Sequence, residues 1–418
     1  MALNNNVLDK VLFFLFCIIP VSIIAGPVVS LLNIIFLSLL SIYLHLKNIN
    51  DYEFFKNQYL FLIIILFIYL LFNLIISQDY NLSLARNLGF LRYIFLFIVF
   101  NFFFYENKKV KEIFKFWTII FLIFLIDVYI EYFFGSNLFG WGAQEINGVT
   151  QVHADRILSF FKDEPVAGAF MLGFIFLIFG HLMENSKNTL IAIIVLSIST
   201  LAIMLTGERS NLIKVLISIM IFLILINKID YKKKILVFLI ILGTLSMTLK
   251  YSDYIKNRYH YIFQLNSKEK ILEFAQESIY FKIYRSGLSV FKNYPLFGVG
   301  NKNYRLVTCE KKYKESNKDY ICQTHPHQIY IEFLAEHGLV GTIIILGIFF
   351  YMFFNILIKI YSNQNYIQLG AFSFLISHFL PLLPSGAFFG DFNSTIFWVN
   401  FSILIASSKE TNIFNLKK

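Results

Sequence analysis

Long apolar stretches separated by short polar segments run along the whole chain. A helix needs about 20 mostly apolar residues to cross roughly 30 Å of membrane hydrocarbon, and most of the stretches approach or exceed that length. They occupy residues 11–25, 27–45, 59–77, 90–105, 113–134, 166–183, 189–206, 211–227, 235–250, 329–358, 366–383 and 390–407. The pattern therefore predicts about twelve transmembrane helices.

The composition agrees with this pattern. Of the 418 residues, 57% are hydrophobic and 15% are charged, whereas soluble domains carry about a quarter charged residues. The apolar stretches lack the alternation that strands of a membrane barrel require. We predict an all-α polytopic integral membrane protein with one large outward helical loop. The net charge of +10 is ascribed to topology and anionic lipid rather than to nucleic acid.

Positive charge predicts the orientation, because short loops rich in lysine face the cytoplasm. If the twelve helices alternate in direction, every lysine cluster falls on one side. These lysines are Lys10, Lys47, Lys56, Lys108, Lys109, Lys111, Lys187, Lys228, Lys232, Lys233, Lys234, Lys359, Lys409, Lys417 and Lys418. Both termini are then predicted to be cytoplasmic, and the polar segments 78–89, 135–165 and 251–328 face outward.

The outward segment 251–328 is longer than a connection needs. We expect three parts: residues 1–250 with nine membrane helices, the loop domain 251–328 with short amphipathic helices, and residues 329–418 with three more helices. The loop domain carries thirteen Lys or Arg residues against seven Asp or Glu residues. The inside-positive rule does not favour Lys and Arg residues on the outer side. Their excess in this loop domain therefore indicates an anionic ligand.

Two of the three cysteines, Cys309 and Cys322, lie in this loop domain. In an oxidising compartment they either form a disulfide, which would stabilise the loop by about 2–3 kcal/mol, or remain two free thiols. Cys17 lies in the first apolar stretch, where a buried small hydrophobic side chain is expected. Neither a Cys-x-x-Cys nor a His-x-x-x-His pattern accompanies them, so we expect no metal site.

The stretch THPHQIYIEFLAEHGLVG, residues 324–341, opens an apolar helix with polar groups. A continuous helix over 328–358 would be about 46 Å long at 1.5 Å per residue, longer than the hydrocarbon is thick, so His327 is expected at the outer interface near its start. Gly338 and Gly341 would let another backbone approach beneath the histidine. The imidazole could accept a proton from a sugar hydroxyl; the alternative is an interfacial histidine with a local hydrogen bond.

The turn TGERSN, residues 206–211, places Arg209 between two apolar stretches, where a charge costs about 2.5–3.5 kcal/mol. A guanidinium can grip a phosphate with two hydrogen bonds. The alternative is that Arg209 extends to the interface and pairs with Glu208.

Basic residues also mark an expected amphipathic helix within Tyr284–Tyr304 and its approach. The helix should end at Asn293-Tyr294-Pro295, before a Gly-Val-Gly turn. Arg285, with Lys282 one turn away, would either bind a lipid headgroup or belong to a solvated face.

The segment before the sixth apolar stretch is rich in charge as well. Its candidates are His153, Asp155, Arg156, Lys162, Asp163 and Glu164. Because Pro165 marks a helix entry, Asp163 or Glu164 is predicted to cap that helix. Arg156 is a candidate for anion binding.

Together these motifs resemble the O-antigen ligase and polymerase superfamily of bacterial envelope glycan transferases. The signature of that family is His, then Asn, Ser or Gln, nine residues, Gly, two residues, and Gly, Thr or Tyr. His327-Gln328 and Gly338-Leu339-Val340-Gly341 match it completely. TGERSN resembles the Thr-x-Ser-Arg-Gly turn, with Glu208 for Ser and Ser210 for Gly. YRSGLSVFKNYPLFGVG is similar to Trp-Arg-x-Ala-Leu followed by Pro-Leu-x-Gly-Val-Gly, and SFFKDEPVAGAF to the segment before the preceding helix. The resemblance covers roughly 150–345.

The resemblance implies a glycosyltransferase of the inner membrane that uses no metal, nucleotide or other cofactor. Its active site would face the periplasm, its donor would be a glycan on undecaprenyl pyrophosphate, and its acceptor a lipid A-core sugar. His327 would deprotonate the acceptor, while Arg209 and Arg285, with Lys282 and Arg156 as further candidates, would hold the pyrophosphate. One departure stands out. In many relatives the functional arginine lies four residues before the Trp of the Trp-Arg-x-Ala-Leu motif. Tyr284 matches that Trp, and the residue four positions before it is Tyr280.

Several functions remain open at this stage. A polymerase would join two lipid-linked glycans, and another relative would glycosylate protein. A transporter, from a different functional class, should carry polar residues along its helix interiors. Asp127 and Glu131 in the fifth stretch are the main charges of that kind.

Overall fold

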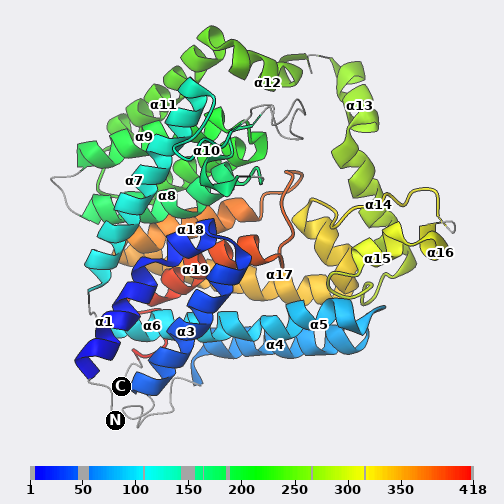
Figure 1. Ribbon diagram of the computed structural model, residues 1–418, viewed down its shortest axis with the longest axis horizontal. Coiled ribbons are helices and arrows are strands. Elements are labelled where there is room, and N and C mark those ends of the chain that lie inside the picture. The colour runs from blue at the N-terminus through cyan, green and yellow to red at the C-terminus, as the bar shows by residue number, and fades with distance from the viewer. Residues whose placement is uncertain are drawn as a thin grey trace.

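The computed structural model describes residues 5–45, 56–106, 109–142, 156–162, 164–184, 189–264, 267–314 and 317–415. Over these ranges the regular structure is helical, without a β-strand (Figure 1). The elements are α1 (Asn5–Cys17), α2 (Ile19–Ile24), α3 (Pro27–His45), α4 (Gln58–Ile75), α5 (Tyr80–Gly89), α6 (Leu91–Tyr105), α7 (Val110–Phe134), the 3₁₀ turn η2 (Ser159–Phe161), α8 (Ala167–Glu184), α9 (Thr189–Leu205), α10 (Arg209–Leu225), α11 (Tyr231–Tyr251), α12 (Asp253–Gln264), α13 (Lys268–Glu277), α14 (Ile279–Asn293), α15 (Tyr304–Cys309), α16 (Lys311–Lys314), α17 (Ile329–Asn363), α18 (Tyr366–His378) and α19 (Asp391–Ala406).

A helix occupies each of the twelve predicted apolar stretches, and α1 and α2 share the first. By length and hydropathy, six helical stretches in the described ranges can cross a membrane: α4, α5 with α6, α7, α8, α11 and α17. The prediction of an all-helical membrane protein is therefore confirmed, while the count of about twelve crossings stays a prediction. α18 ends at His378, short of the predicted 383, because Pro381 and Pro384 follow and proline cannot continue a helix.

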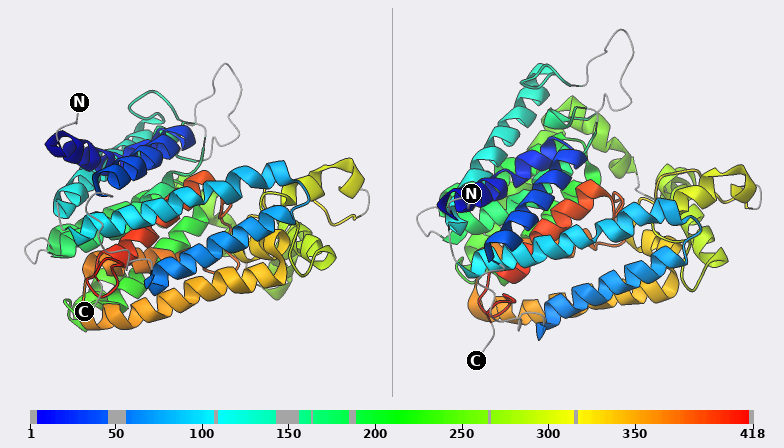
Figure 2. Two further views of the ribbon diagram at one scale, coloured as in Figure 1. Left: turned by 90° about the horizontal axis from the view of Figure 1, so that it is seen from below. Right: turned by 60° about the horizontal axis from the view of Figure 1, so that its bottom comes forward.

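The lysine-bearing helix ends meet at one end of the molecule. Lys359 Nζ lies 3.1 Å from Tyr59 Oη at the start of α4, and Lys228 Nζ donates to the carbonyl of Met183 at the end of α8. Both ends of the chain lie on this side in every view (Figures 1 and 2). The common placement agrees with the alternating helices deduced from lysine, and its assignment to the cytoplasm stays a prediction.

Helix α8 lies at the centre of the bundle and is buried on nearly all sides. It packs closely against α18 because a glycine on each helix faces the backbone of the other. A Cβ added at Gly180 would lie 2.3 Å from the carbonyl oxygen of Tyr366, and one at Gly370 would lie 2.1 Å from that of Phe176. Such close backbone approach is typical of helix pairs in membranes, and it holds α18 and α19 against the helices that line the site.

Helix α17 is interrupted, so the prediction of one continuous helix over 328–358 is wrong. Gly338 has φ +65° and ψ −170°, which breaks the helical hydrogen bonding. The Pro295–Gly300 loop satisfies the freed groups: Val299 N donates to Ala335 O (3.0 Å), and Leu339 N donates to Pro295 O (2.8 Å). A Cβ on Gly338 would lie 2.4 Å from the Leu296 carbonyl carbon. The expectation that Gly338 admits another backbone is thus confirmed.

The second glycine of that motif meets a side chain instead of a backbone. A Cβ on Gly341 would lie 1.8 Å from the hydroxyl oxygen of Tyr69 on α4. The same hydroxyl donates to the carbonyl of His337 at 3.3 Å. Gly341 therefore lets α4 pack against α17 just beyond the break.

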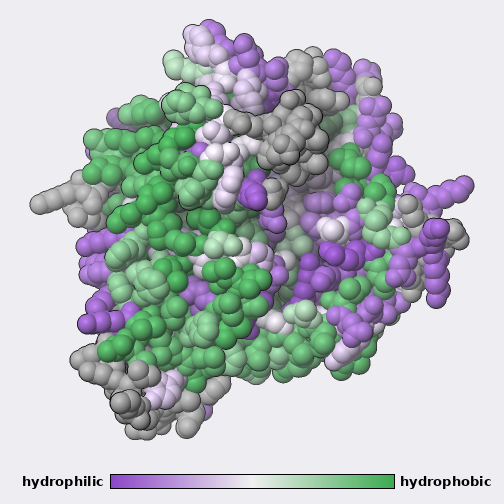
Figure 3. All heavy atoms as spheres, in the orientation of Figure 1, coloured by the Kyte–Doolittle hydropathy of each residue, from purple (hydrophilic) through white to green (hydrophobic). Residues whose placement is uncertain are grey.

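The segment between α11 and α17 holds the five helices α12 to α16. In Figure 1, α12 lies at the top of the molecule and α13 to α16 lie at its right. Hydrophilic side chains gather along this top and right margin, while a broad hydrophobic surface covers the helices at the left (Figure 3). A disulfide joins Cys309 at the end of α15 to Cys322, with the Cα atoms 4.4 Å apart. Cys17 is a buried free thiol, as expected. The bridge holds the chain that leads into His327 against α15.

Candidate active site

A cavity of about 240 Å³ contains His327 and is called the polar cavity below. Its walls come from segments between residues 156 and 396: the stretch before α8 and its first turns, the first turns of α10 and α14, the approach to α17, the end of α18, and the α18–α19 loop with the start of α19. The lining residues are Arg156, Pro165, Val166, Ala169, Leu172, Glu208, Ser210, Asn211, Lys214, Tyr280, His327, Phe374, His378, Pro384, Ser385, Gly386, Asn393 and Ile396.

His327 is held in place by the loop that follows α18. Its backbone has φ +55°, a left-handed conformation that is uncommon outside glycine. Its carbonyl accepts from Ser385 N at 2.9 Å, and Nε2 of His325 lies 3.3 Å from Ser385 O. The ring of Tyr280 faces the imidazole edge-on, with the centroids 6.0 Å apart. Burial lowers the pKa of His327, and a hydrogen bond with the backbone of Ser385 acts in the opposite direction; the imidazole is therefore neutral at pH 7.

The polar residue that follows the histidine, Gln328, has a structural role. Its Oε1 accepts from Ile331 N at 2.9 Å, so it is the N-cap of α17. Capping satisfies a backbone N–H that the first turn leaves free. Because the cap fixes where the helix begins, His327 stays outside the helix and turns into the cavity.

The two glutamates of the same stretch anchor loops instead of facing the ligand space. Both carboxylate oxygens of Glu332 accept from Phe388 N at 3.0 Å, and Glu336 Oε1 accepts from Tyr304 N at 3.3 Å. Both side chains are fully buried. They fasten the α18–α19 loop and the start of α15 to α17, which keeps Ser385 beside the histidine.

Glu208 caps α8, the role predicted for Asp163 or Glu164. Its carboxylate accepts from Gly168 N and from Asn211 Nδ2, each at 2.5 Å. Burial raises its pKa to about 7. α8 begins only at Ala167, and Glu164 shows no capping bond among the described contacts, so the capping prediction for Glu164 is wrong; Asp163 lies outside the described residues.

Guanidinium groups gather around the start of α10. Burial, and after it the charge of Arg258, lowers the pKa of Arg209, and Arg156 acts in the same direction, whereas Tyr280 and Tyr259 act in the opposite direction. Arg258, on α12, donates from Nε to Gly207 O at 3.1 Å. No ion pair joins Arg209 to Glu208 within the described part of the chain, which removes the alternative role of Arg209 as the partner of Glu208. Like charges held together in this way form a site for an anion.

Arg285 and Lys282 are placed differently from the other candidates. Both side chains are exposed on α14, and neither lines the polar cavity. α14 packs closely against α17 at Gly287, where an added Cβ would lie 2.4 Å from Ile331 Cγ2. This close contact turns Tyr280 toward the cavity, at the position where the family resemblance implied an arginine.

The sequence alone did not identify Arg258, Ser385 or Lys214 as members of the site. Arg258 contributes to the basic excess of the loop domain but has no motif around it. Ser385 lies in a Pro-rich loop outside the region of resemblance, and Lys214 is one turn beyond the TGERSN stretch. His153 and Asp155 lie outside the described residues.

Comparison with protein families shows one match. The family model described as O-antigen ligase matches residues 191–346, from the start of α9 into α17. The matched region contains Arg209, Arg258, Tyr280 and His327, whereas Arg156 precedes it. A search among curated proteins found no match.

Proposed function

Because the chain belongs to the O-antigen ligase and polymerase superfamily, we propose that it is an O-antigen ligase. It transfers a glycan from undecaprenyl pyrophosphate to a sugar hydroxyl of the lipid A core, at the periplasmic face of the inner membrane. One observation carries the proposal: the imidazole of His327 and the guanidinium of Arg156 line one cavity beside the start of α10, where Arg209 stands.

The proposed step divides between these groups. The acceptor oxygen attacks the anomeric carbon of the donor glycan while His327 takes the hydroxyl proton. The bond from that carbon to the phosphate oxygen breaks, and the pyrophosphate leaves on its polyprenyl carrier with the electron pair. Arg156, Arg209 and Arg258 stabilise the charge that develops on the leaving group. The sugar–phosphate bond is already activated, so the step consumes no nucleotide and needs no metal ion.

A polymerase is the second candidate, since it uses the same donor and differs in its acceptor. The arrangement of His327 and the arginines serves both reactions. Deleting the gene separates them: loss of all long-chain polymer from the lipid A core indicates a ligase, whereas a single repeat retained on the core indicates a polymerase.

The contacts of Asp127 and Glu131 disfavour a transporter. Both are buried within α7, but their carboxylates accept from the loop that precedes α8: Glu131 from Leu158 N (3.0 Å) and Ser159 N (2.6 Å), and Asp127 from Ser159 Oγ (2.6 Å). The two carboxylates hold the loop before α8 in place and do not line a path through the helix bundle.

The proposal predicts transfer by the protein alone. Purified protein in lipid nanodiscs, given a glycan on undecaprenyl pyrophosphate and lipid A-core acceptor, should produce glycosylated core with EDTA present and ATP absent. Product is measured by gel shift and mass spectrometry. Absence of product, with donor and acceptor both shown to be intact, would reject the enzyme assignment.

Arg258 is predicted to matter more for transfer than Arg285. Replacing Arg258 by Ala should lower kcat/KM by about 10²–10³-fold, the usual effect of removing one group that stabilises an oxyanion. R258K retains the charge without the planar fork and should lose less. Arg285→Ala should stay within about twofold of wild type, since a solvated surface charge contributes little.

The same two variants test the residue assignment that the family resemblance implies. If R285A loses activity and R258A does not, Arg285 holds the pyrophosphate, as the family resemblance implies, and Arg258 does not. Thermal unfolding of both variants, measured in parallel, shows whether the Arg258–Gly207 contact has a separate structural effect.

A further inference from the structure

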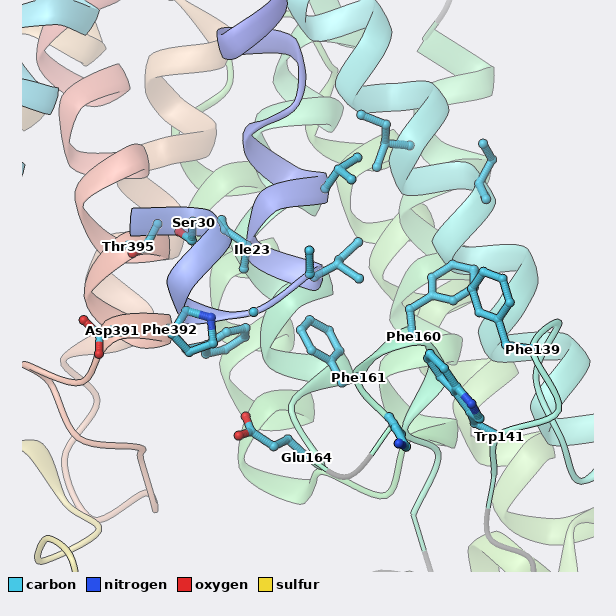
Figure 4. A pocket seen from close by; sticks show the side chains of 18 residues that line it. Ile23, Ser30, Phe139, Trp141, Phe160, Phe161, Glu164, Asp391, Phe392 and Thr395 are labelled. Atoms are coloured by element: carbon cyan, nitrogen blue, oxygen red, sulfur yellow. The ribbon is translucent and has the colours of Figure 1, made fainter. Parts of the chain in front are cut away.

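A second cavity, of about 650 Å³, opens among α2, α3, α7 and the start of α19 and is called the apolar groove below (Figure 4). Its volume is within the range of small-molecule sites. Ile120 and Ile123 on α7 form one wall, and Phe139, Trp141 and Phe160 form another. Ile123 is 50% exposed and Phe139 is 66% exposed, so the groove is open on the outer surface of the helices.

The apolar groove and the polar cavity share a wall. Glu164 lines the groove, and the next residue, Pro165, lines the polar cavity. On α19, Phe392 lines the groove and Asn393 lines the cavity. The rings of Phe161 and Phe392 close this wall edge to face, with centroids 5.6 Å apart. A ligand with one polar and one apolar part therefore needs to cross only a single layer of side chains.

We propose that the apolar groove binds the polyprenyl chain of the donor whose pyrophosphate lies in the polar cavity; this inference rests on the proposed function. The chemistry of the donor favours it over other lipids. In a polyprenyl pyrophosphate the first isoprene unit is bonded directly to the phosphate, so the chain must begin beside the arginines. In a lipid A-core acceptor several sugars separate the acyl chains from the reacting hydroxyl, which imposes no such proximity.

The rim of the groove is suited to the junction between chain and phosphate. Lys162 lies at this rim, with its Nζ 5.9 Å from the centre of the Trp141 ring. Asp391, on the opposite side, is paired with Arg92, which compensates its charge. The indole face and the ammonium group together present an apolar surface that ends in a cation.

Photocrosslinking tests the assignment without requiring turnover. The full-length protein in nanodiscs is irradiated with undecaprenyl pyrophosphate that carries a diazirine in its chain, and the labelled peptides are identified by mass spectrometry. Label is expected on the α7 peptide that contains Ile123 and on the segment of Phe139 and Trp141. Unlabelled undecaprenyl pyrophosphate should compete, and lipid A-core should not.

A matched pair of variants on α7 sharpens the test. Ile123→Trp fills the groove and should reduce labelling by about tenfold or more, because losing contact with two methylene groups already weakens binding by that factor. Ile126→Trp is its control: Ile126 is 56% exposed on the same helix but does not line the groove. I126W should label like wild type. Melting curves of both variants confirm that they fold.

The proposal would be overturned by label confined to other helices, by label unchanged in I123W, or by label competed equally by bulk phospholipid. Competition by lipid A-core alone would assign the groove to the acceptor and overturn it as well. Failure of the groove and failure of the proposed function are distinguishable. Transfer without groove labelling rejects only the groove, and groove labelling without transfer rejects only the enzymatic step.

Discussion

Replacing His327 by alanine should reduce transfer by about 10²–10⁴-fold, the usual contribution of a general base. The imidazole lines the polar cavity, and backbone contacts with Ser385 determine the orientation of its residue. The change removes no packing from the membrane core, because His327 is only partly buried outside α17. Single-turnover rates with a labelled donor measure the chemical step, and donor binding should persist.

The pH profile separates a base from a residue that only positions others. Burial lowers the pKa of His327 below its ordinary value of about 6.5. The neutral form, which accepts the proton, therefore persists as the pH falls, and kcat/KM should decline only below about pH 6.5. H327A should lose this acid limb along with its activity.

A histidine elsewhere in the chain controls for nonspecific effects. His181 stacks on Phe114 at the lysine-bearing end, with ring centroids 5.5 Å apart, away from the residues of the cavity. H181A should keep the wild-type rate of transfer and the wild-type pH profile of kcat/KM. Full turnover by H327A, with its melting temperature unchanged, would remove His327 from the mechanism.

The apolar pattern predicted the helices well because membrane thickness dictates their length. A stretch such as 113–134 has to be helical, since hydrocarbon leaves the backbone no other partner, and α7 occupies it. His327 could also be located, because the stretch 328–358 is longer than the hydrocarbon is thick and the glycines that follow the histidine are a local signal of a close approach.

The remaining members of the site depend on contacts between distant segments, which a local pattern does not reveal. Arg258 reaches Arg209 because α12 lies on the 204–207 turn, where Tyr259 Oη donates to Met204 O at 3.2 Å. Glu208 was expected near Arg209, but its cap partner Gly168 lies forty residues away along the chain. The exposure of Arg285 follows from how α14 rotates when Gly287 packs on Ile331.

Replacing Gly338 by alanine should destabilise the protein by about 2–6 kcal/mol, the largest stability change expected here. With φ +65° and ψ −170°, the backbone adopts a conformation that costs other residues about 1–3 kcal/mol. The new Cβ would also lie 2.4 Å from the Leu296 carbonyl and 2.5 Å from Gly298 N. Relieving this overlap would separate two paired backbones, and overpacking of that kind costs about 1–3 kcal/mol more.

Gly347 is the matched control on the same helix. A Cβ added there meets nothing within 4 Å, and alanine is the better helix former by about 1 kcal/mol. G347A should therefore melt at or slightly above the wild-type temperature, while G338A melts well below it, as followed by tryptophan fluorescence in detergent. Because the break holds the Pro295–Gly300 loop, and that loop leads back to α14 and Tyr280, G338A should also lose donor binding. If G338A were as stable as G347A, α17 would run unbroken through residue 338, and the position of His327 above it would need another explanation.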